Sequence, residues 1–331
     1  MTGSMKPTLH FHPDGTFRIL MVSDIHGGVG YNRAQTVEAL QALVDTAKPD
    51  LVFFGGDTAG PGMIHIETTD QLRDLLTDLS APMENAGIPW AHVYGNHDDN
   101  YGVSNADAQP VYESFPNCIS EAGPEDIDGV GNYVLPVYDG SRIAFNLWAL
   151  DSHSGMNEFR QAYGLPENTK FLSPRSGSAS GYDSVHFNQI MWYWQTSCAM
   201  EQKNGAGIPA LLFMHIPTPE HALCTLFRDE CNFEGTQLED VACTSLNAGL
   251  FSACLQRGDV KGIFCGHDHV NDFTATYCGI MLGYDGFLSY HACHRNEIRG
   301  GRVIDLHTDG TFTTKMLRVR DILGAKGDSI L

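Results

Sequence analysis

The sequence predicts an α/β protein with a largely parallel β-sheet and a second sheet packed against it. In the first hundred residues, short apolar runs alternate with segments whose apolar residues follow helical spacing, which is typical of β-α-β-α-β units. Two apolar runs around a turn at residues 139–141 indicate paired strands, and residues 275–317 contain strand-like runs with glycine breaks. With 331 residues, 42% of them hydrophobic, the chain can build a large core.

The N-terminal elements are defined by apolar runs and by their boundary residues. The expected strands cover residues 17–22, 51–54 and 89–94. The expected helices cover residues 36–47 and a segment that begins at Thr68 or Thr69 and places several leucines on one face. This alternation favours parallel strands with helices packed on the sheet.

The rest of the chain contains further strands, one core helix and three polar segments. The expected strands cover residues 133–138, 142–150, 210–214 and 260–265, and the expected helix covers residues 187–200. Residues 99–131, 154–182 and 217–250 are polar or irregular and are expected to form variable rim loops. We expect a single domain over residues 1–331, with a core from about residue 17 to 317.

Five short polar motifs each follow an apolar run. They are Asp24-Ile25-His26, Gly56-Asp57, Gly95-Asn96-His97-Asp98, His215 and Gly266-His267-Asp268-His269. Because open α/β sheets bind ligands at the carboxyl ends of their strands, we expect the motifs to meet at one edge of the sheet. Taken singly, each motif could be a strand-end turn or a core histidine. Together they favour a metal site.

The residue types in these motifs indicate which ions could bind. Aspartate, asparagine and histidine suit two adjacent ions such as Mn, Fe, Zn or similar metals, and the many imidazoles disfavour an all-oxygen Mg or Ca site. A carboxylate that binds two ions holds them about 3.5–4 Å apart, which is the spacing used for in-line displacement at phosphorus. The motifs therefore predict two divalent or transition-metal ions as cofactors.

In this order, the five motifs resemble the calcineurin-like metallophosphoesterase superfamily. The resemblance covers residues 17–270 and implies a four-layer αββα double β-sheet sandwich, the metallo-dependent phosphatase-like fold. The Gly-Tyr-Asp-Gly-Phe segment at 283–287 and the segment at 299–303 also resemble the fungal Dcr2-type and plant purple-acid-phosphatase-29-like branch.

The resemblance implies a role for each motif residue. The implied ligands of the first metal are Asp24, His26 and His269, those of the second are Asn96, His215 and His267, and Asp57 is implied to bind both ions. His97 is implied to be catalytic, stabilising the transition state or protonating the leaving oxygen. The implied reaction is hydrolysis of a phosphate monoester or diester by metal-bound hydroxide.

One position departs from the purple acid phosphatases of this superfamily. In those enzymes a tyrosine three residues after the bridging aspartate binds ferric iron. Here that position is Gly60, and the first motif carries His26 instead. We therefore do not expect a purple iron–tyrosinate site.

Charge and composition limit the partners. The formal net charge of −20, from 40 acidic and 20 basic residues, disfavours general nucleic-acid binding and leaves a small phosphorylated substrate. The alternative function is a metal-binding protein of the same fold that acts as an interaction module without hydrolysis, and amide hydrolysis is a third possibility. The complete ligand set together with His97 favours the phosphoesterase.

The sequence also predicts the cellular compartment of the protein and the oxidation state of its cysteines. Residues 1–13 lack the apolar core of a signal peptide and no apolar run approaches about 18 residues, so we expect a cytoplasmic protein without membrane contact. The nine cysteines are expected to be reduced. In an exported protein, disulfides could form among Cys224, Cys231, Cys243 and Cys254.

Several residues outside the ligand set have two interpretations. Asp98 and Asp268 could orient neighbouring imidazoles or be solvated turn carboxylates. Loop arginines could clamp a phosphate; they are Arg33, Arg160 and Arg175. Three other histidines are interpreted as ordinary surface or structural residues, although the first could face the site; they are His153, His291 and His294.

Overall fold

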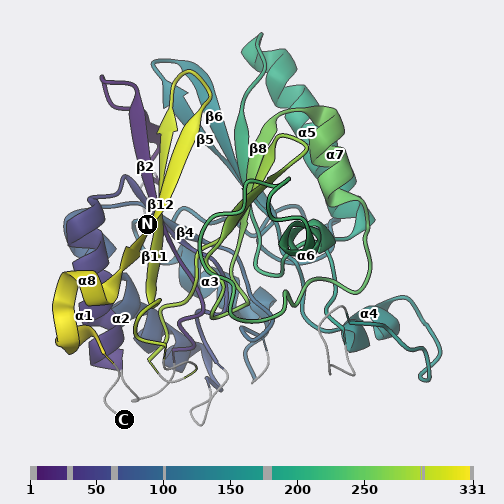
Figure 1. Cartoon of the computed structure of the whole chain (residues 1–331), viewed down its shortest axis with the longest axis horizontal. Helices are drawn as coiled ribbons and strands as arrows, with labels where there is room; N and C mark the ends of the chain where they lie inside the picture. The colour runs from purple at the N-terminus through teal and green to yellow at the C-terminus, as the bar shows by residue number, and fades with distance from the viewer. Residues whose placement is uncertain are drawn as a thin grey trace.

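Two mixed β-sheets pack face to face, and helices cover both outer faces, in a computed structural model of the chain (Figure 1). The structure describes residues 6–27, 33–60, 66–99, 102–173, 181–290, 292 and 295–328. Helices α1, α2 and α8 lie on one side of the double sheet, and α5 and α7 lie on the other (Figure 1). This arrangement is the αββα sandwich that the sequence analysis expected.

The first sheet contains the N-terminal β-α-β-α-β unit. Its order is β12-β11-β2-β3-β4, with β2 (Thr16–Val22), β3 (Leu51–Phe54) and β4 (Trp90–His92) parallel to one another. The strands are joined by α1 (Arg33–Ala47) and α2 (Thr69–Ala86). The side chain of Thr68 accepts a hydrogen bond from the Gln71 backbone and so caps α2, as the sequence predicts.

The second sheet has the order β1-β5-β6-β7-β8-β10-β9. Its strands are β1 (Leu9–His10), β5 (Tyr133–Asp139), β6 (Arg142–Ala149), β7 (Ala210–Phe213), β8 (Val260–Cys265), β9 (Thr274–Tyr277) and β10 (Ile280–Tyr284). Strands β6, β7, β8 and β10 run parallel. Helices α5 (Phe187–Asn204) and α7 (Leu250–Arg257) cover the outer face (Figure 1).

The second sheet that the sequence predicts is present, but of the C-terminal strands only β9 and β10 belong to it. The β9–β10 pair extends the second sheet beside β8, whereas β11 (Gly300–His307) and β12 (Phe312–Arg318) extend the first sheet beside β2. Apolar periodicity marks a strand but does not identify its neighbour, because pairing depends on residues far away in the sequence.

The three expected rim loops each contain a short helix, which corrects a second expectation. The helices are α3 (Asn105–Glu113), α4 (Met156–Ala162) and α6 (Pro219–Leu226). The polar composition of α3 and its internal Pro110 gave no helical pattern in the sequence. The Ser104 side chain caps its first turn by accepting a hydrogen bond from the Asp107 backbone amide at 3.1 Å. After β12 the chain ends in α8 (Val319–Leu323) and a 3₁₀ turn (Gly324–Gly327).

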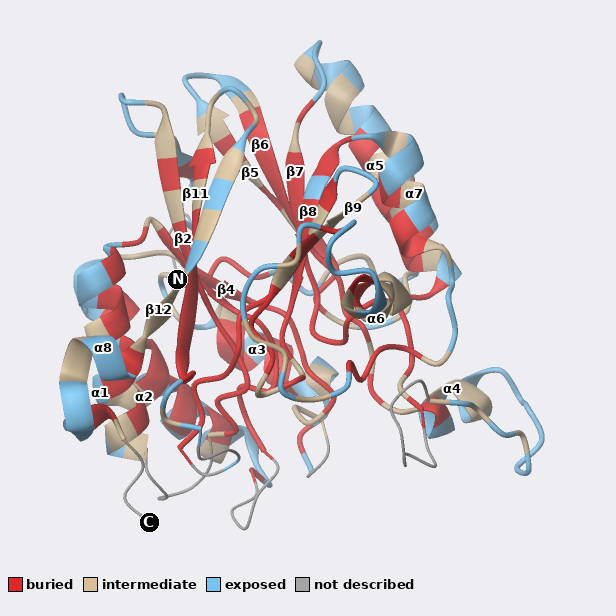
Figure 2. Ribbon diagram, viewed as in Figure 1, coloured by how far each residue is buried: buried red, intermediate tan, exposed pale blue. Residues whose placement is uncertain are grey.

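Apolar side chains fill three layers, because both faces of each sheet are covered. Alternate residues of β2 point to opposite faces: Ile19 and Met21 face the second sheet, whereas Leu20 and Val22 face the helices. Figure 2 shows buried residues along the strands of both sheets. The rigid double sheet therefore fixes the positions at which its strands end.

Two properties of the described residues concern membranes and thiols. No helix in the described part of the chain is long and apolar enough to cross a bilayer. The described cysteines are free thiols, including Cys224, Cys231, Cys243 and Cys254.

Candidate metal centre

The five polar motifs meet at one end of the double sheet. Asp24 and His26 follow β2, Asp57 follows β3, Asn96 and His97 follow β4, His215 follows β7, and His267 and His269 follow β8. Strands β2 to β4 belong to the first sheet and β7 and β8 to the second. The site therefore lies where both sheets end, and not along one edge of a single sheet as the sequence analysis expected.

Left-handed backbone conformations direct several of these side chains toward one another. The φ angles of Asp24, His26, Asp57 and His267 are 50°, 51°, 49° and 77°. Such conformations cost of order 1–3 kcal/mol each and persist only where surrounding contacts hold them. The Asp24 amide donates to the Gly56 carbonyl at 3.1 Å, and the His26 amide donates to the Asp57 carbonyl at 2.9 Å. The first two motifs thus hold each other in place.

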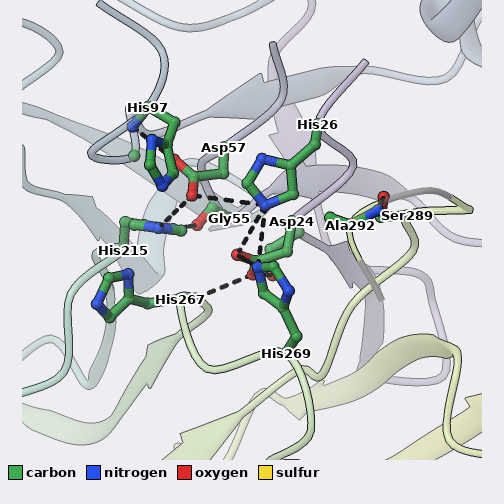
Figure 3. A network of polar contacts seen from close by, with 12 residues as sticks. Asp24, His26, Gly55, Asp57, His97, His215, His267, His269, Ser289 and Ala292 are labelled. Carbon is green, nitrogen blue, oxygen red and sulfur yellow. Dashed lines mark hydrogen bonds and ion pairs between the residues drawn. The ribbon is translucent and has the colours of Figure 1, made fainter. Parts of the chain in front are cut away.

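Asp24, His26 and His269 form one group whose ligand atoms all lie within 4.8 Å of one another (Figure 3). His26 Nε2 lies 3.0 Å from His269 Nε2, and Asp24 Oδ1 lies 3.4 Å from His269 Nε2. Two ligand atoms about 2.1 Å from one ion, at roughly 90–110° to each other, are separated by about 3.0–3.4 Å. The two contacts of His269 therefore have the spacing of ligands of a shared ion, and the third pair, Asp24 Oδ1 and His26 Nε2, lies 3.9 Å apart.

Asp57, His215 and His267 form a second group within 4.8 Å, and Asp57 connects it to the first. Asp57 Oδ2 lies 3.2 Å from His215 Nε2 and 3.8 Å from His26 Nε2. Its other oxygen, Oδ1, accepts a hydrogen bond from the His97 backbone amide at 2.9 Å. One oxygen of Asp57 thus lies between imidazoles of both groups, where a carboxylate shared by two ions would lie.

Hydrogen bonds to backbone carbonyls determine which imidazole nitrogens face the centre. His26 Nδ1 lies 2.7 Å from the Gly60 carbonyl oxygen, and His215 Nδ1 lies 2.8 Å from the Gly55 carbonyl oxygen. Because a carbonyl oxygen can only accept, each Nδ1 carries a proton, and Nε2 is the nitrogen that faces Asp57 in both rings. Burial lowers the pKa of His26 to about 4, which keeps this ring neutral.

Asp24 and Asp57 are fully buried, yet the pKa of each carboxyl group is lowered, so both favour their charged forms. Burial alone would raise the pKa of Asp24, but the hydrogen bond to His269 and the charges of His215 and His269 outweigh it and lower the pKa to about 2. Burial likewise disfavours a charged His215, but the adjacent Asp57 outweighs this effect and raises the pKa of His215 to about 10. Positive charge is therefore strongly stabilised at this centre, as a cation site requires.

One buried nitrogen of the second ligand group has no hydrogen-bond partner among the described residues. Within that part of the chain, His267 Nε2 is buried and makes no hydrogen bond. Such atoms are rare in folded proteins because desolvation without a partner is costly. A metal ion at the second group would complete the bonding of this nitrogen, so the residues present fit the expected cofactors.

Gly56 and Gly95 are required because neighbouring residues lie too close for a side chain at either position. A Cβ atom at Gly95 would lie 2.1 Å from Asp57 Oδ1, and one at Gly56, where φ is +96°, would lie 2.5 Å from His215 Nδ1. Any side chain at these positions would displace Asp57 or His215.

Asn96, Asp98 and Asp268 are held by hydrogen bonds to neighbouring segments. Asn96 is buried, and its backbone carbonyl accepts from Ser154 Oγ at 2.9 Å. Asp98 accepts from the backbone amides of Ala59 at 2.8 Å and Gly95 at 2.7 Å, so it joins the second and third motifs through their main chains. Asp268 accepts a hydrogen bond from the hydroxyl of Tyr284 at 2.5 Å.

Arg33 and Arg160, which were expected to lie in loops, lie in α1 and α4, and each bonds to nearby residues. Arg33 pairs with Asp74 and Asp78 on α2, at 2.7 and 2.9 Å. Arg160 donates to Asn157 and to the Thr169 carbonyl within the α4 region. Three other positions considered from the sequence lie outside the described residues: Arg175, His291 and His294.

His153 belongs to a third group of possible ligands, with Asp183 and His186. The imidazole of His186 lies between Asp128, at 2.8 Å, and Asp183, at 3.2 Å. Burial opposes its charged form, but these two partners outweigh burial and raise the pKa of His186. The His153 and His186 rings stack 4.0 Å apart at 20°, so their lone pairs run nearly parallel and do not converge on one ion. We interpret this group as a buried ion-pair cluster.

Tyr182 is a neighbour of the centre that the sequence analysis missed. Its ring meets the ring of His267 edge-on, at 4.3 Å and 86°. Its backbone forms isolated β-bridges with Gly155 and Thr244, so Tyr182 joins two of the rim segments, 154–182 and 217–250, beside the second group. Its position at the end of a polar loop gave no sequence signal, because the contact depends on chain folding over a long distance.

The double sheet and its two aspartate–histidine groups define a metallo-dependent phosphatase-like protein. The chain belongs to the calcineurin-like phosphoesterase family, whose model matches residues 17–271.

Relatives and solved structures agree with this assignment. Two Arabidopsis thaliana proteins, probable inactive purple acid phosphatases 14 and 28, are 34% and 32% identical to the chain, over 86% and 90% of its length and 73% and 77% of theirs. Phosphatase DCR2 of Saccharomyces cerevisiae is 26% identical over 78% of this chain and 45% of its own. The crystal structure of a dimetal phosphatase from Danio rerio has the same fold, with a TM-score of 0.58 at 15% identity over 92% of this chain and 96% of that one. The resemblance noted from the sequence is confirmed.

Proposed function

We propose that the protein is a dinuclear metal-dependent phosphoesterase that hydrolyses a small phosphate monoester or diester. The observation that carries this proposal is the position of Asp57 Oδ2, 3.2 Å from His215 Nε2 in one ligand group and 3.8 Å from His26 Nε2 in the other. Membership of the calcineurin-like phosphoesterase family supports the same reaction class.

Each ion has a defined set of proposed ligands. Asp24, His26 and His269 would hold the first ion, Asn96, His215 and His267 would hold the second, and Asp57 would contact both. When bound, such ions polarise phosphoryl oxygens and lower the pKa of water so that hydroxide is available at neutral pH. The many imidazoles favour Mn, Fe or Zn over Ca or Mg.

His97 is the proposed catalytic side chain. Its backbone amide is fixed by Asp57 Oδ1, and its half-buried ring lies 5.6 Å from the ring of His26 (Figure 3). Burial lowers the pKa of His97, so its imidazolium gives up a proton readily. We assign it to protonation of the leaving oxygen or to stabilisation of the charge that develops there.

The test combines metal analysis with a substrate screen. Protein stripped of metal is reloaded with Mn²⁺, Zn²⁺ or Fe²⁺, its metal content is measured, and hydrolysis of p-nitrophenyl phosphate and bis(p-nitrophenyl) phosphate is followed. We expect two ions per chain and activity that appears only with metal. The ratio of the two rates assigns the monoester or diester class.

The names of the plant relatives leave one alternative, which the same experiment tests. Two of them are called probable inactive phosphatases. If this chain binds two ions but hydrolyses neither ester with any of the metals, it is a metal-binding protein that uses the fold for interaction.

A further inference from the structure

The segment from Tyr284 to Ser289 follows β10 and packs against the first ligand group. The Leu288 amide donates to the Ser23 carbonyl at 3.0 Å, and the Ser289 amide donates to the Asp24 carbonyl at 3.1 Å. Figure 3 shows Ser289 near Asp24. These two bonds hold the main chain at Asp24, which has a left-handed conformation. Residues 284–289 are therefore in direct contact with the proposed metal centre.

Asp285 of this segment is connected to Asp24 through one hydroxyl. Ser23 Oγ lies 2.7 Å from Asp285 Oδ1 and also makes a short hydrogen bond to Asp24 Oδ2. Ser23 Oγ also lies 3.2 Å from the Gly286 carbonyl oxygen. A hydroxyl carries one hydrogen, so it donates to one of these three oxygens, and a carboxyl group that is not its acceptor must carry a proton to bond to it. Burial raises the pKa of Asp285 well above its ordinary value, which suits a neutral acid that donates to Ser23.

The hydrogen bonds from Asp285 through Ser23 fix the orientation of the Asp24 carboxylate. Asp24 Oδ2 is occupied by Ser23 and by the His267 backbone amide, which donates to it at 2.9 Å. The other oxygen, Oδ1, is left facing His269 Nε2 at 3.4 Å. If Asp285 were replaced by an apolar residue, Ser23 would lose one of its partners and the carboxylate of Asp24 could rotate.

Tyr284 makes an equivalent connection to the fifth motif. Its buried hydroxyl donates to Asp268 Oδ2 at 2.5 Å, and Asp268 lies between the proposed ligands His267 and His269. The ring of Phe287 stacks against the ring of His269, with centroids 6.2 Å apart at 27°. One continuous segment thus contacts both motifs that supply the first ligand group.

We propose that Tyr284 and Asp285 are positioning residues of the first metal site, with Asp285 acting through Ser23 on Asp24 and Tyr284 acting through Asp268 on His269. The inference rests on the proposed dinuclear centre. It also gives a physical role to the Gly-Tyr-Asp-Gly-Phe segment. Partners that orient metal ligands typically change metal affinity 10- to 100-fold when removed.

The test is a Zn²⁺ titration of metal-free protein against a competing chelator, which resolves the two binding steps. His269→Ala identifies the step of the first group and His267→Ala that of the second. We expect Tyr284→Phe and Asp285→Ala each to weaken the first step about 10- to 100-fold and to change the second by less than about threefold. Asp285→Asn keeps a donor for Ser23 and should bind Zn²⁺ within about threefold of the wild type.

A matched control separates positioning from general packing. Tyr290 is also a buried tyrosine in this region, but its hydroxyl donates to the Gly327 carbonyl, at 3.1 Å, and not to a ligand motif. Tyr290→Phe should leave both Zn²⁺ steps unchanged. Far-UV circular dichroism checks folding, and because Tyr284→Phe removes a single oxygen atom it decides the matter if Asp285→Ala does not fold.

The possible results are distinct. Wild-type binding of both ions by Tyr284→Phe and Asp285→Ala would overturn the inference, as would equal weakening of both steps. A wild-type protein that binds fewer than two Zn²⁺ ions would instead refute the dinuclear centre on which the inference rests.

Discussion

Replacing His97 by alanine separates catalysis from metal binding in this centre. The interaction of His97 with Asp57 uses the backbone amide, at 2.9 Å from Asp57 Oδ1, and alanine keeps that amide. The His97 side chain belongs to neither ligand group. We therefore expect His97→Ala to retain two ions per chain while losing the imidazole that serves the leaving oxygen.

The magnitude follows from the role of the imidazole. General acid catalysis contributes about 10²–10⁴-fold to a rate, and each factor of ten corresponds to about 1.4 kcal/mol of activation free energy. Loss of His97 should thus raise the barrier by about 2.7–5.4 kcal/mol, seen in kcat. The effect should be larger for phenyl phosphate than for p-nitrophenyl phosphate, because a better leaving group needs a proton less.

The assay measures kcat for both aryl phosphates and the metal content of the same sample. His153→Ala is the matched control, since His153 is also half-buried near the rim but bonds to Gln189 at 2.9 Å. We expect that variant to stay within about threefold of the wild type. Full activity in His97→Ala would refute the assigned role, and an equal loss for both leaving groups would refute a role at the leaving oxygen.

Two further predictions follow from the buried charges. Asp57→Asn should weaken both ions together, because one oxygen lies near imidazoles of both groups; two full ions by elemental analysis would exclude a shared carboxylate. The pKa of His186 is higher in the folded protein than in the unfolded chain. Its ion pairs with Asp128 and Asp183 therefore stabilise the fold to their full extent when the pH is below the unfolded-state pKa near 6.5. This stabilisation is lost as the pH rises through the folded-state pKa. Chemical denaturation should therefore show His186→Gln less stable than the wild type by about 1.5–3 kcal/mol at pH 5.5 and by less at pH 9, and a pH-independent difference would contradict the charged pair.

The parts of the fold that local patterns control were predicted well. The first β-α-β-α-β unit, the Thr68 cap and helix α5 agree with their apolar spacing and boundary residues. Helices α3, α4 and α6 were missed because they are short, at seven to nine residues, so their stability depends on tertiary packing more than on a long periodic apolar face.

Sequence by itself determined which residues compose the centre. Each motif is local: a buried strand ends and the next few residues supply aspartate, asparagine or histidine, as at Asp24, Asp57 and His215. Such identities and spacings can be recognised without knowing how the strands pair.

Only the tertiary structure decided how the motifs meet. It divided them between two sheets, brought Asp57 Oδ2 between His26 and His215, and placed the segment after β10 behind the first group. These contacts join residues up to 265 positions apart, such as Asp24 and Ser289. Strand pairing and side-chain hydrogen bonds over such distances follow from the packing of the whole core, which no local pattern encodes.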